Sequence, residues 1–233
     1  KISEVQCKTL DLSTVRFIIN GAEPISRSVV NKFMKKFSQY GLKTNAMCPA
    51  YGMAEAVVGI TCSPIGQKLK IKVISRFDLL NSNASIAHAE NINHDDKVYF
   101  FHEGHPFKGT SIRIADFDGN TLLENQVGEI QVKSLSITSG YYNNEKATAK
   151  AFYKDGWFRT GDLGLLVDGS LVVTGRIKDI IFVNGQNYFS HDLEELVCSQ
   201  DNIQRGDLVF VGLFDAILQK EVLLAFIKHK VDI

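Results

Sequence analysis

Apolar runs and turn signals alternate along the first part of the chain. Residues 15–19 form a short apolar run typical of a buried strand, and the turn signal Asn20-Gly21 follows directly. A second strand is predicted at 43–47. Between them Ser26 can cap a helix that ends near Gly41, with apolar positions that include Val29, Val30, Phe33, Met34 and Phe37. Strand, helix and strand in this order form a βαβ unit, which predicts a parallel sheet covered by helices.

The pattern changes to β structure after a weakly periodic stretch. From Pro64 to about Asp96 polar residues dominate, which predicts an irregular insertion on the surface. Alternation at 110–115 and 127–132 around Asp118-Gly119 predicts a hairpin, and residues 165–167 and 171–173 around Asp168-Gly169 predict another. The remaining predicted elements are a short helix capped by Asn143 or Asn144 and running to Ala151, a strand at 180–183 before Asn184-Gly185, a helix capped by Ser190, and strands at 208–213 and 222–227.

Composition excludes several partners. The chain has 233 residues and a formal net charge of zero, so a general electrostatic partner such as nucleic acid or an anionic membrane surface is not expected. No apolar run approaches the roughly 18 residues that a membrane span requires. The start, Lys1-Ile2-Ser3-Glu4, has no apolar signal region, so nothing marks the chain for secretion. The cysteines described next indicate reduced thiols in a cytoplasmic protein.

Cysteine and histidine spacing does not favour a metal site or disulfides. Cys7, Cys48, Cys62 and Cys198 are widely and irregularly spaced, which is typical of reduced thiols. Four histidines fall close together but lack the i, i+4 spacing of a helical ligand pair; they are His88, His94, His102 and His105.

Four segments carry the candidate chemistry, and each alone is no more than a common turn. They are Gly21-Ala22-Glu23-Pro24-Ile25 at the end of a strand, Tyr51-Gly52-Met53-Ala54-Glu55 after the next strand, Trp157-Phe158-Arg159-Thr160-Gly161-Asp162-Leu163-Gly164 before the second hairpin, and Gly175-Arg176-Ile177-Lys178-Asp179-Ile180-Ile181 continuing to Asn184-Gly185. In this order and spacing they resemble the adenylate-forming superfamily: acyl-CoA synthetases, nonribosomal peptide adenylation domains and luciferases. The resemblance covers nearly the whole chain.

The sequence is most similar to the fatty acyl-AMP ligases of this superfamily. Leu10-Asp11-Leu12-Ser13 leading into Asn20-Gly21 looks like their version of the region, and Ala54 stands where many other relatives carry Thr. The polar stretch between Glu55 and Gly104-His105-Pro106 falls where these ligases carry an insertion associated with withholding acyl-adenylate from coenzyme A. The resemblance implies a ligase that activates a fatty acid with ATP and Mg²⁺ as acyl-AMP, for transfer to an acyl carrier protein or a downstream polyketide or nonribosomal peptide synthase.

The resemblance also implies a role for each nucleotide-binding residue. Gly21, Ala22 and Glu23 would place backbone against the adenine, while Tyr51, followed by Gly52 and Met53, would stack on the purine. Asp162 would accept hydrogen bonds from the ribose hydroxyls, and Arg176 would reach the ribose or phosphate. The alternatives are a core tyrosine at position 51 and a turn-stabilising aspartate at position 162.

Two further residues would serve catalysis. Glu55 would hold Mg²⁺ at the phosphates, and Lys178 matches the family's hinge, about which a small C-terminal domain swings. Their alternatives are a surface carboxylate and a solvated strand residue. Because the family's phosphate loop and its C-terminal catalytic lysine have no counterpart in this sequence, the chain alone is expected to adenylate little or nothing.

The predicted fold class is α/β, with three parts cut from a larger protein. Residues 1–105 would end a large α/β domain, 106–175 would form a β-rich subdomain, and 176–233 would begin a small α+β domain. Three alternatives stay open: an acyl-CoA synthetase, an amino-acid adenylation domain, and a non-catalytic remnant that binds nucleotide without turnover.

Overall fold

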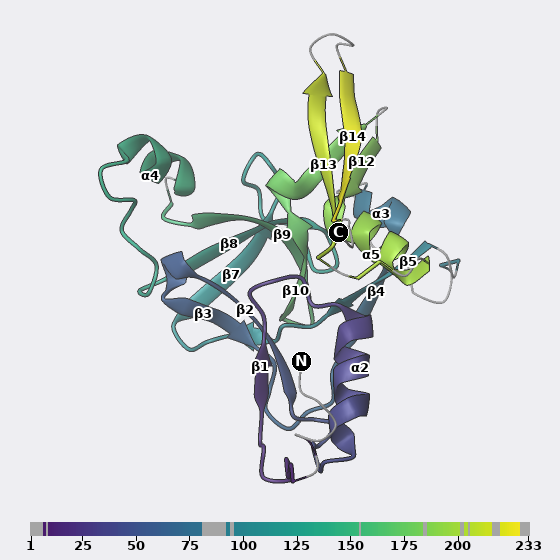
Figure 1. Cartoon of the computed structure of the whole chain (residues 1–233). Coiled ribbons are helices and arrows are strands. Elements are labelled where there is room, and N and C mark those ends of the chain that lie inside the picture. The colour runs from purple at the N-terminus through teal and green to yellow at the C-terminus, as the bar shows by residue number, and fades with distance from the viewer. Residues whose placement is uncertain are drawn as a thin grey trace.

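The computed structural model describes residues 7, 9–80, 92–93, 96–153, 155–183, 186–200, 203–204, 206–215 and 220–228. The N-terminal part of the chain forms the predicted βαβ unit (Figure 1). Strand β1 (Ile18–Asn20) pairs in parallel with β2 (Met47–Met53), and α2 (Arg27–Ser38) connects them. The Ser26 side chain caps α2 by accepting a hydrogen bond from the Val29 amide, as predicted.

Strand β2 begins later than the sequence pattern predicted. Residues 43–46 form a turn in which the Ala46 amide donates to the Lys43 carbonyl at 3.1 Å, so the strand starts at Met47 and runs through Pro49. Tyr51, Gly52 and Met53 therefore lie inside a strand and not after one. The sheet is also mixed rather than parallel, in the order β1-β2-β3-β6, because β3 (Val58–Cys62) and β6 (His105–Pro106) pair antiparallel.

The predicted irregular insertion contains regular structure. Strand β4 (Ile71–Ser75) leads into helix α3 (Arg76–Leu80), and β4 pairs antiparallel with β5 (Lys97–Phe101). Ile74 is fully buried, so this part of the chain joins the core. The prediction was wrong for these residues because the strand's partner lies beyond the polar stretch, where no local pattern reveals it. The rest of the insertion, with His88 and His94, lies outside the described residues.

The second sheet confirms both predicted hairpins. Its order is β10-β9-β8-β7, antiparallel throughout, from β7 (Thr110–Ala115), β8 (Gly128–Ser134), β9 (Phe158–Val167) and β10 (Ser170–Arg176). Asp168 and Gly169 have φ of 50° and 70°, which makes a two-residue turn of the type that matches strand twist. Helix α4 (Glu145–Ala151) is capped by Asn144, whose side chain accepts from the Ala147 amide.

Strand β9 is longer than its apolar part predicted. It begins at Phe158, so the segment from Phe158 to Gly164 is part of the hairpin and does not precede it. Its polar residues interrupt the apolar alternation that predicts a strand, because their side chains bond to polar side chains of the neighbouring strand. Arg159, for example, donates to Glu129 of β8 at 3.0 Å.

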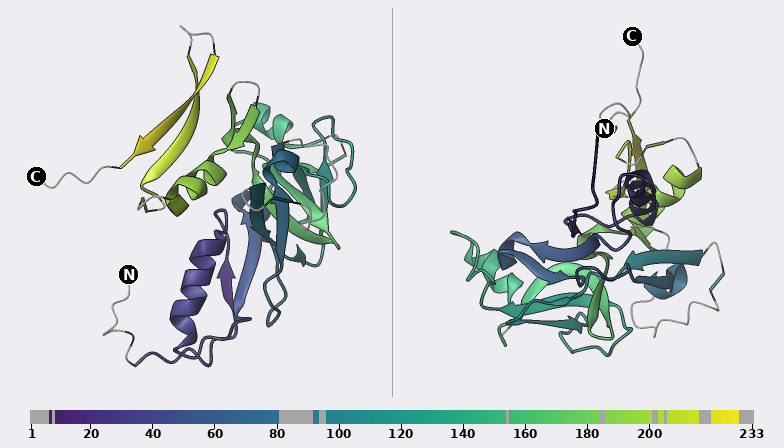
Figure 2. Two further views of the ribbon diagram at one scale, coloured as in Figure 1. Left: turned by 90° about the vertical axis from the view of Figure 1, so that its right-hand side faces the viewer. Right: turned by 90° about the horizontal axis from the view of Figure 1, so that it is seen from below.

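The C-terminal part consists of one helix and two strand pairs. After the short 3₁₀ turn η4 (Ile177–Asp179), β11 (Ile180–Val183) pairs with β12 (Gln186–Phe189), a strand that the sequence did not predict. Helix α5 (Ser190–Gln200) follows, and β13 (Leu208–Asp215) pairs with β14 (Lys220–Ile227) in a hairpin that projects from the rest of the fold (Figure 2). Among the described residues, no helix is long and apolar enough to cross a membrane.

Two buried clusters hold the sheets together. One joins the β4–β5 pair to the second sheet and to Phe189 of β12, and includes Ile74, Val98, Phe100, Leu165 and Val172. The other joins the first sheet to the second through Tyr51, Ile60, Ile114, Ile130 and Leu171. The two sheets and the β4–β5 pair therefore meet around a common centre, and the cavity described below opens there.

Candidate nucleotide-binding site

The four candidate segments meet at a cavity of about 520 Å³. Six of the eight predicted nucleotide-binding residues line it: Ala22, Glu23, Tyr51, Gly52, Asp162 and Arg176. Gly21 and Met53 flank it without lining it. Residues that the sequence did not single out also contribute, among them Arg76, Lys97, Glu103, Thr174 and His191. The cavity is large enough for a nucleoside-sized ligand.

The first segment turns tightly at the end of β1. A Cβ at Gly21 would collide with the carbonyl oxygen of Ala50 on β2, so only glycine allows the loop to lie this close to the neighbouring strand. Ala22 follows with φ of 73°, in the left-handed region that non-glycine residues rarely adopt. This conformation holds the backbone of Ala22 and Glu23 at the rim of the cavity.

Tyr51, Asp162 and Arg176 form one hydrogen-bonded group across the two sheets. The Tyr51 hydroxyl donates to Asp162 Oδ2 at 2.6 Å, and Arg176 Nε donates to Oδ1 at 2.7 Å. Burial, followed by the Asp162 charge, raises the pKa of Tyr51, so this hydroxyl keeps its proton and acts as a donor. The hydrogen bond to Asp162 raises the pKa of Arg176. Tyr51 belongs to the core and lines the cavity as well, so the two interpretations of this residue are compatible.

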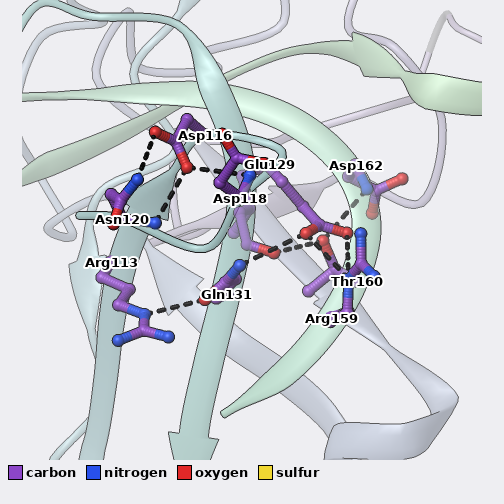
Figure 3. Close-up of polar contacts among 10 residues, drawn as sticks. Arg113, Asp116, Asp118, Asn120, Glu129, Gln131, Arg159, Thr160 and Asp162 are labelled. Atoms are coloured by element: carbon purple, nitrogen blue, oxygen red, sulfur yellow. Dashed lines mark hydrogen bonds and ion pairs between the residues drawn. The ribbon is translucent and has the colours of Figure 1, made fainter. Parts of the chain in front are cut away.

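Asp162 lies within strand β9, so the alternative of a turn-stabilising aspartate is wrong. Its amide donates to Thr160 Oγ1 at 3.0 Å, and the Thr160 hydroxyl donates to the carbonyl of Ile130 at 2.7 Å. Figure 3 shows these contacts beside a chain of side chains that runs from Arg113 through Gln131 and Glu129 to Arg159. The backbone of Asp162 is thus held within β9 and next to β8, while Tyr51 and Arg176 hold its carboxylate.

Glu55 lies in the 3₁₀ turn η1 (Ala54–Ala56), outside the cavity lining. Its Oε1 accepts from the Tyr141 hydroxyl at 2.9 Å, and its carbonyl accepts from the Thr138 amide at 2.7 Å. Within the described part of the chain, no three His, Cys, Asp or Glu residues gather as a metal cluster. A cation at Glu55 would therefore depend on oxygen atoms of the ligand, as Mg²⁺ does when phosphates supply part of its coordination.

Lys178 is exposed in η4, directly after β10. The alternative of a solvated strand residue was therefore right about the exposure of Lys178 and wrong about the strand. Arg176 ends β10 of the second sheet, and Lys178 lies between that sheet and the C-terminal strands and helix. Asn184 and Gly185, the end of the fourth segment, lie outside the described residues.

Helix α5 is docked over the cavity by polar contacts. Arg76 of α3 donates to both carboxylate oxygens of Asp192, from Nε at 2.7 Å and from Nη2 at 3.1 Å. The Ser26 hydroxyl donates to Glu195 Oε1 at 3.4 Å. These contacts bring α5 against α3 and against Ser26, the residue that caps α2.

Glu103 is a buried acid on the cavity wall that the sequence analysis missed. It is 8% exposed, and burial, followed by the Asp162 charge, raises its pKa to about 8. The only signal in the sequence is a glutamate that follows the strand residues 97–101 and precedes Gly104. That signal does not distinguish a buried acid from a loop residue on the surface.

Comparison with known proteins agrees with this arrangement. The family model described as AMP-binding enzyme matches residues 2–142. The chain therefore belongs to the AMP-binding enzyme family, as the sequence resemblance indicated. It is 34% identical over 81% of its length to the medium-chain-fatty-acid–[acyl-carrier-protein] ligase JamA of Moorena producens, and covers 33% of that protein.

Two further matches support the same class. The long-chain-fatty-acid–AMP ligase FadD32 of Mycolicibacterium smegmatis is 32% identical over 79% of this chain, which covers 32% of it. A structure from a study of fatty acyl-adenylate ligases from E. coli and L. pneumophila superposes with a TM-score of 0.82 at 31% identity, covering 96% of this chain and 39% of that one. The chain thus spans about a third of the length of the curated relatives it matches.

Proposed function

We propose that this chain is the adenylate-binding part of a ligase that activates a fatty acid with ATP, releasing pyrophosphate, and passes the acyl group to an acyl carrier protein. One observation carries the proposal: residues from segments far apart in sequence line a single cavity, where Tyr51 and Arg176 hold the carboxylate of Asp162. The names of the relatives, fatty-acid–AMP and fatty-acid–carrier-protein ligases, supply the substrate class.

The nucleotide would occupy the cavity with its adenine toward β1 and its ribose toward β9. The backbone at Ala22 and Glu23 would contact the base, with Gly21 allowing the close approach, Tyr51 and Gly52 forming the adjoining wall, and Met53 flanking it. Both oxygens of Asp162 already accept one hydrogen bond each, and each keeps a second lone pair for a ribose hydroxyl. Arg176 would add a fixed positive charge beside the sugar and phosphate.

Glu55 would be the carboxylate ligand of Mg²⁺. A single protein carboxylate suits this ion when phosphate oxygens complete its coordination. When bound, Mg²⁺ would neutralise charge on the phosphates and so allow a second anion, the fatty carboxylate, to approach. The Tyr141 hydroxyl holds Glu55 in place by its hydrogen bond to Oε1.

The proposed organisation has three parts, with boundaries near residues 105 and 175. The whole ligase would be a cytoplasmic enzyme of lipid or polyketide synthesis. Its C-terminal part would rotate about Lys178. Rotation about this hinge would break the ion pair between Arg76 and Asp192, because the two residues lie on opposite sides of it.

The segment between Glu55 and Gly104 would withhold the acyl-adenylate from coenzyme A.

Calorimetric titration of the chain with AMP tests the nucleotide site. We expect binding that weakens at least tenfold in Asp162→Asn, since a charged acceptor of hydrogen bonds is lost. Asp118→Asn, an exposed turn residue, is the matched control and should bind as the wild type does. Equal affinity in all three proteins would remove Asp162 from the site.

A second experiment tests the reaction on the longer protein that contains this chain. A long-chain fatty acid, ATP, Mg²⁺ and coenzyme A are supplied, and the products are read by mass spectrometry. Acyl-AMP without acyl-CoA supports the ligase. Abundant acyl-CoA identifies an acyl-CoA synthetase instead, and AMP binding with no product identifies a non-catalytic remnant.

A further inference from the structure

Glu103 presents an unpaired carboxyl oxygen in the cavity wall. Its Oε2 is buried and has no hydrogen-bond partner among the residues that the structure describes. The backbone fixes its position, because the Glu103 amide donates to the Leu171 carbonyl and the Leu171 amide donates to the Gly104 carbonyl, both at 2.8 Å. Glu103 is therefore held against strand β10 with one carboxyl oxygen, Oε2, that no described residue pairs.

A second polar atom in the same wall is also unpaired. Thr174 is 1% exposed on β10, and its hydroxyl has no partner within the described part of the chain. Thr174 lies where the pairing of β10 with β9 shifts register, between Val173 and Gly175. Buried polar groups are normally satisfied, because leaving one without a partner costs about 1–3 kcal/mol. Two such groups lining one cavity indicate a polar ligand that would complete both.

The position of Glu103 relative to Asp162 suggests which part of the ligand it meets. Burial, followed by the negative charge of Asp162, raises the pKa of Glu103, and the charge of Glu103 in turn contributes to the raised pKa of Tyr51. Other titratable groups lining the cavity are Glu23, Arg76, Lys97, Tyr99, Arg176, Asp179, His191, Asp192 and Glu195. A protonated carboxyl can both donate and accept a hydrogen bond, whereas an ionised one can only accept. A sugar hydroxyl, which also does both, is a suitable partner.

We propose that Glu103 is a further nucleotide-binding residue that contacts the ribose hydroxyls beside Asp162. This inference rests on the proposed function, since it assigns a part of the same nucleotide site. Because Asp162 accepts from Tyr51 and Arg176 through both oxygens, and Glu103 has a raised pKa, the site offers one group that accepts and one that also donates. The pair distinguishes a ribose from a sugar that lacks its hydroxyls.

Calorimetric titration with AMP and with 2′,3′-dideoxy-AMP tests the inference. The proteins are the wild type, Glu103→Leu and Glu103→Gln, with the exposed Glu145→Gln of α4 as the control. We expect Glu103→Leu to lose about tenfold in AMP affinity and little in dideoxy-AMP affinity, because only the hydroxyl contact is removed. Glu103→Gln can still donate and accept, so its affinity at pH 7 should stay near the wild-type value.

The pH dependence gives a second measurement. From pH 6.5 to 9.5 the wild type should bind AMP less tightly as Glu103 loses its proton, while Glu103→Gln should lack that part of the decline. If Glu103→Leu does not fold, as judged by circular dichroism, the comparison of pH profiles between the wild type and Glu103→Gln tests the inference by itself. Parallel pH profiles overturn the inference.

The outcomes separate the two proposals. A wild-type chain that binds no AMP at millimolar concentration overturns the proposed function and this inference with it. A wild type that binds AMP, together with a folded Glu103→Leu that keeps the same preference for AMP over dideoxy-AMP, overturns the inference alone.

Discussion

The Tyr51 hydroxyl donates a 2.6 Å hydrogen bond to Asp162, a residue 111 positions further along the chain. Tyr51 belongs to β2 of the first sheet and Asp162 to β9 of the second, and both are buried. The bond therefore joins the sheets at the point where the cavity opens. A nucleotide would meet a carboxylate whose direction the protein has already fixed, which lowers the cost of ordering it on binding.

Replacing Tyr51 by Phe should destabilise the fold. The substitution removes a buried hydrogen bond to a charged acceptor, and we expect the free energy of unfolding to fall by about 1.5–3 kcal/mol. Tyr188→Phe is the matched control, since the Tyr188 hydroxyl donates to Gln186 over the same 2.6 Å but in an exposed position. Urea denaturation measures both. Equal losses of unfolding free energy in the two variants would mean that burial does not strengthen the contribution of the Tyr51 hydrogen bond to stability.

Replacing Asp162 by Asn should change the titration of Glu103. The Asp162 charge is one of the two causes that raise the pKa of Glu103 to about 8, so its removal should lower that pKa. Burial, the larger cause, remains, and the value should stay above that of an ordinary glutamate. Carboxyl ¹³C chemical shifts followed against pH measure it, with Asp118→Asn as the control. An unchanged pKa would show that the two acids do not interact.

Gly21→Ala should cost more than another glycine-to-alanine change on the surface. The new Cβ would collide with the Ala50 carbonyl, and backbone cannot yield as a flexible side chain does. Gly109 is the control because it has φ of 86° and no atoms near the position of a Cβ, so its substitution meets only local strain of about 1 kcal/mol. We expect Gly21→Ala to lose at least about 2 kcal/mol of unfolding free energy. Thermal or urea denaturation that ranks the two variants in the opposite order would contradict this.

Sequence patterns identified the elements whose pairing partners or caps are local. The Asp168-Gly169 hairpin, the Ser26-capped helix and the β1–α2–β2 unit were all confirmed, because turn chemistry and apolar periodicity act over a few residues. Strand β4 was missed since its partner β5 follows a long polar stretch. Strand β9 was predicted too short because Arg159 and Asp162 break its apolar alternation.

The site was accessible to prediction only through its motifs. Tyr51, Asp162 and Arg176 were chosen by resemblance, and the structure brings them into one hydrogen-bonded group. Their assignment to a nucleotide stays a prediction. Glu103 and Thr174 belong to no motif, and their significance depends on burial and on the absence of partners among the described residues, which are properties of the folded chain.

Replacing Asp192 by Asn should loosen the docking of α5. The change weakens the two hydrogen bonds from Arg76, which are charge-assisted and partly buried. We expect faster hydrogen exchange throughout Ser190–Gln200, measured by mass spectrometry, while β7 and β8 keep their protection. Asp207→Asn is the control, because Asp207 meets Lys228 only at 4.0 Å on the surface. Unchanged exchange in α5 would mean that the contacts between Arg76 and Asp192 are not needed to hold the helix.

Stability should fall as pH rises, with Glu103 as one source. Burial raises its pKa from 4.5 to about 8, so between these values the folded chain binds a proton that the unfolded chain has released. Stability decreases wherever the folded state binds more protons, and the loss should level off above about pH 8. Between pH 5 and 9 this group should remove about 2–4 kcal/mol of unfolding free energy.

Glu103→Gln isolates that contribution, because glutamine cannot ionise and other titrating groups are common to both proteins. The variant should therefore gain stability relative to the wild type as pH rises, and the difference should stop growing near pH 8–9. Urea denaturation at intervals of half a pH unit measures it. A constant difference across the range would mean that Glu103 titrates normally in the folded chain, and would contradict the raised pKa on which the expected loss of stability rests.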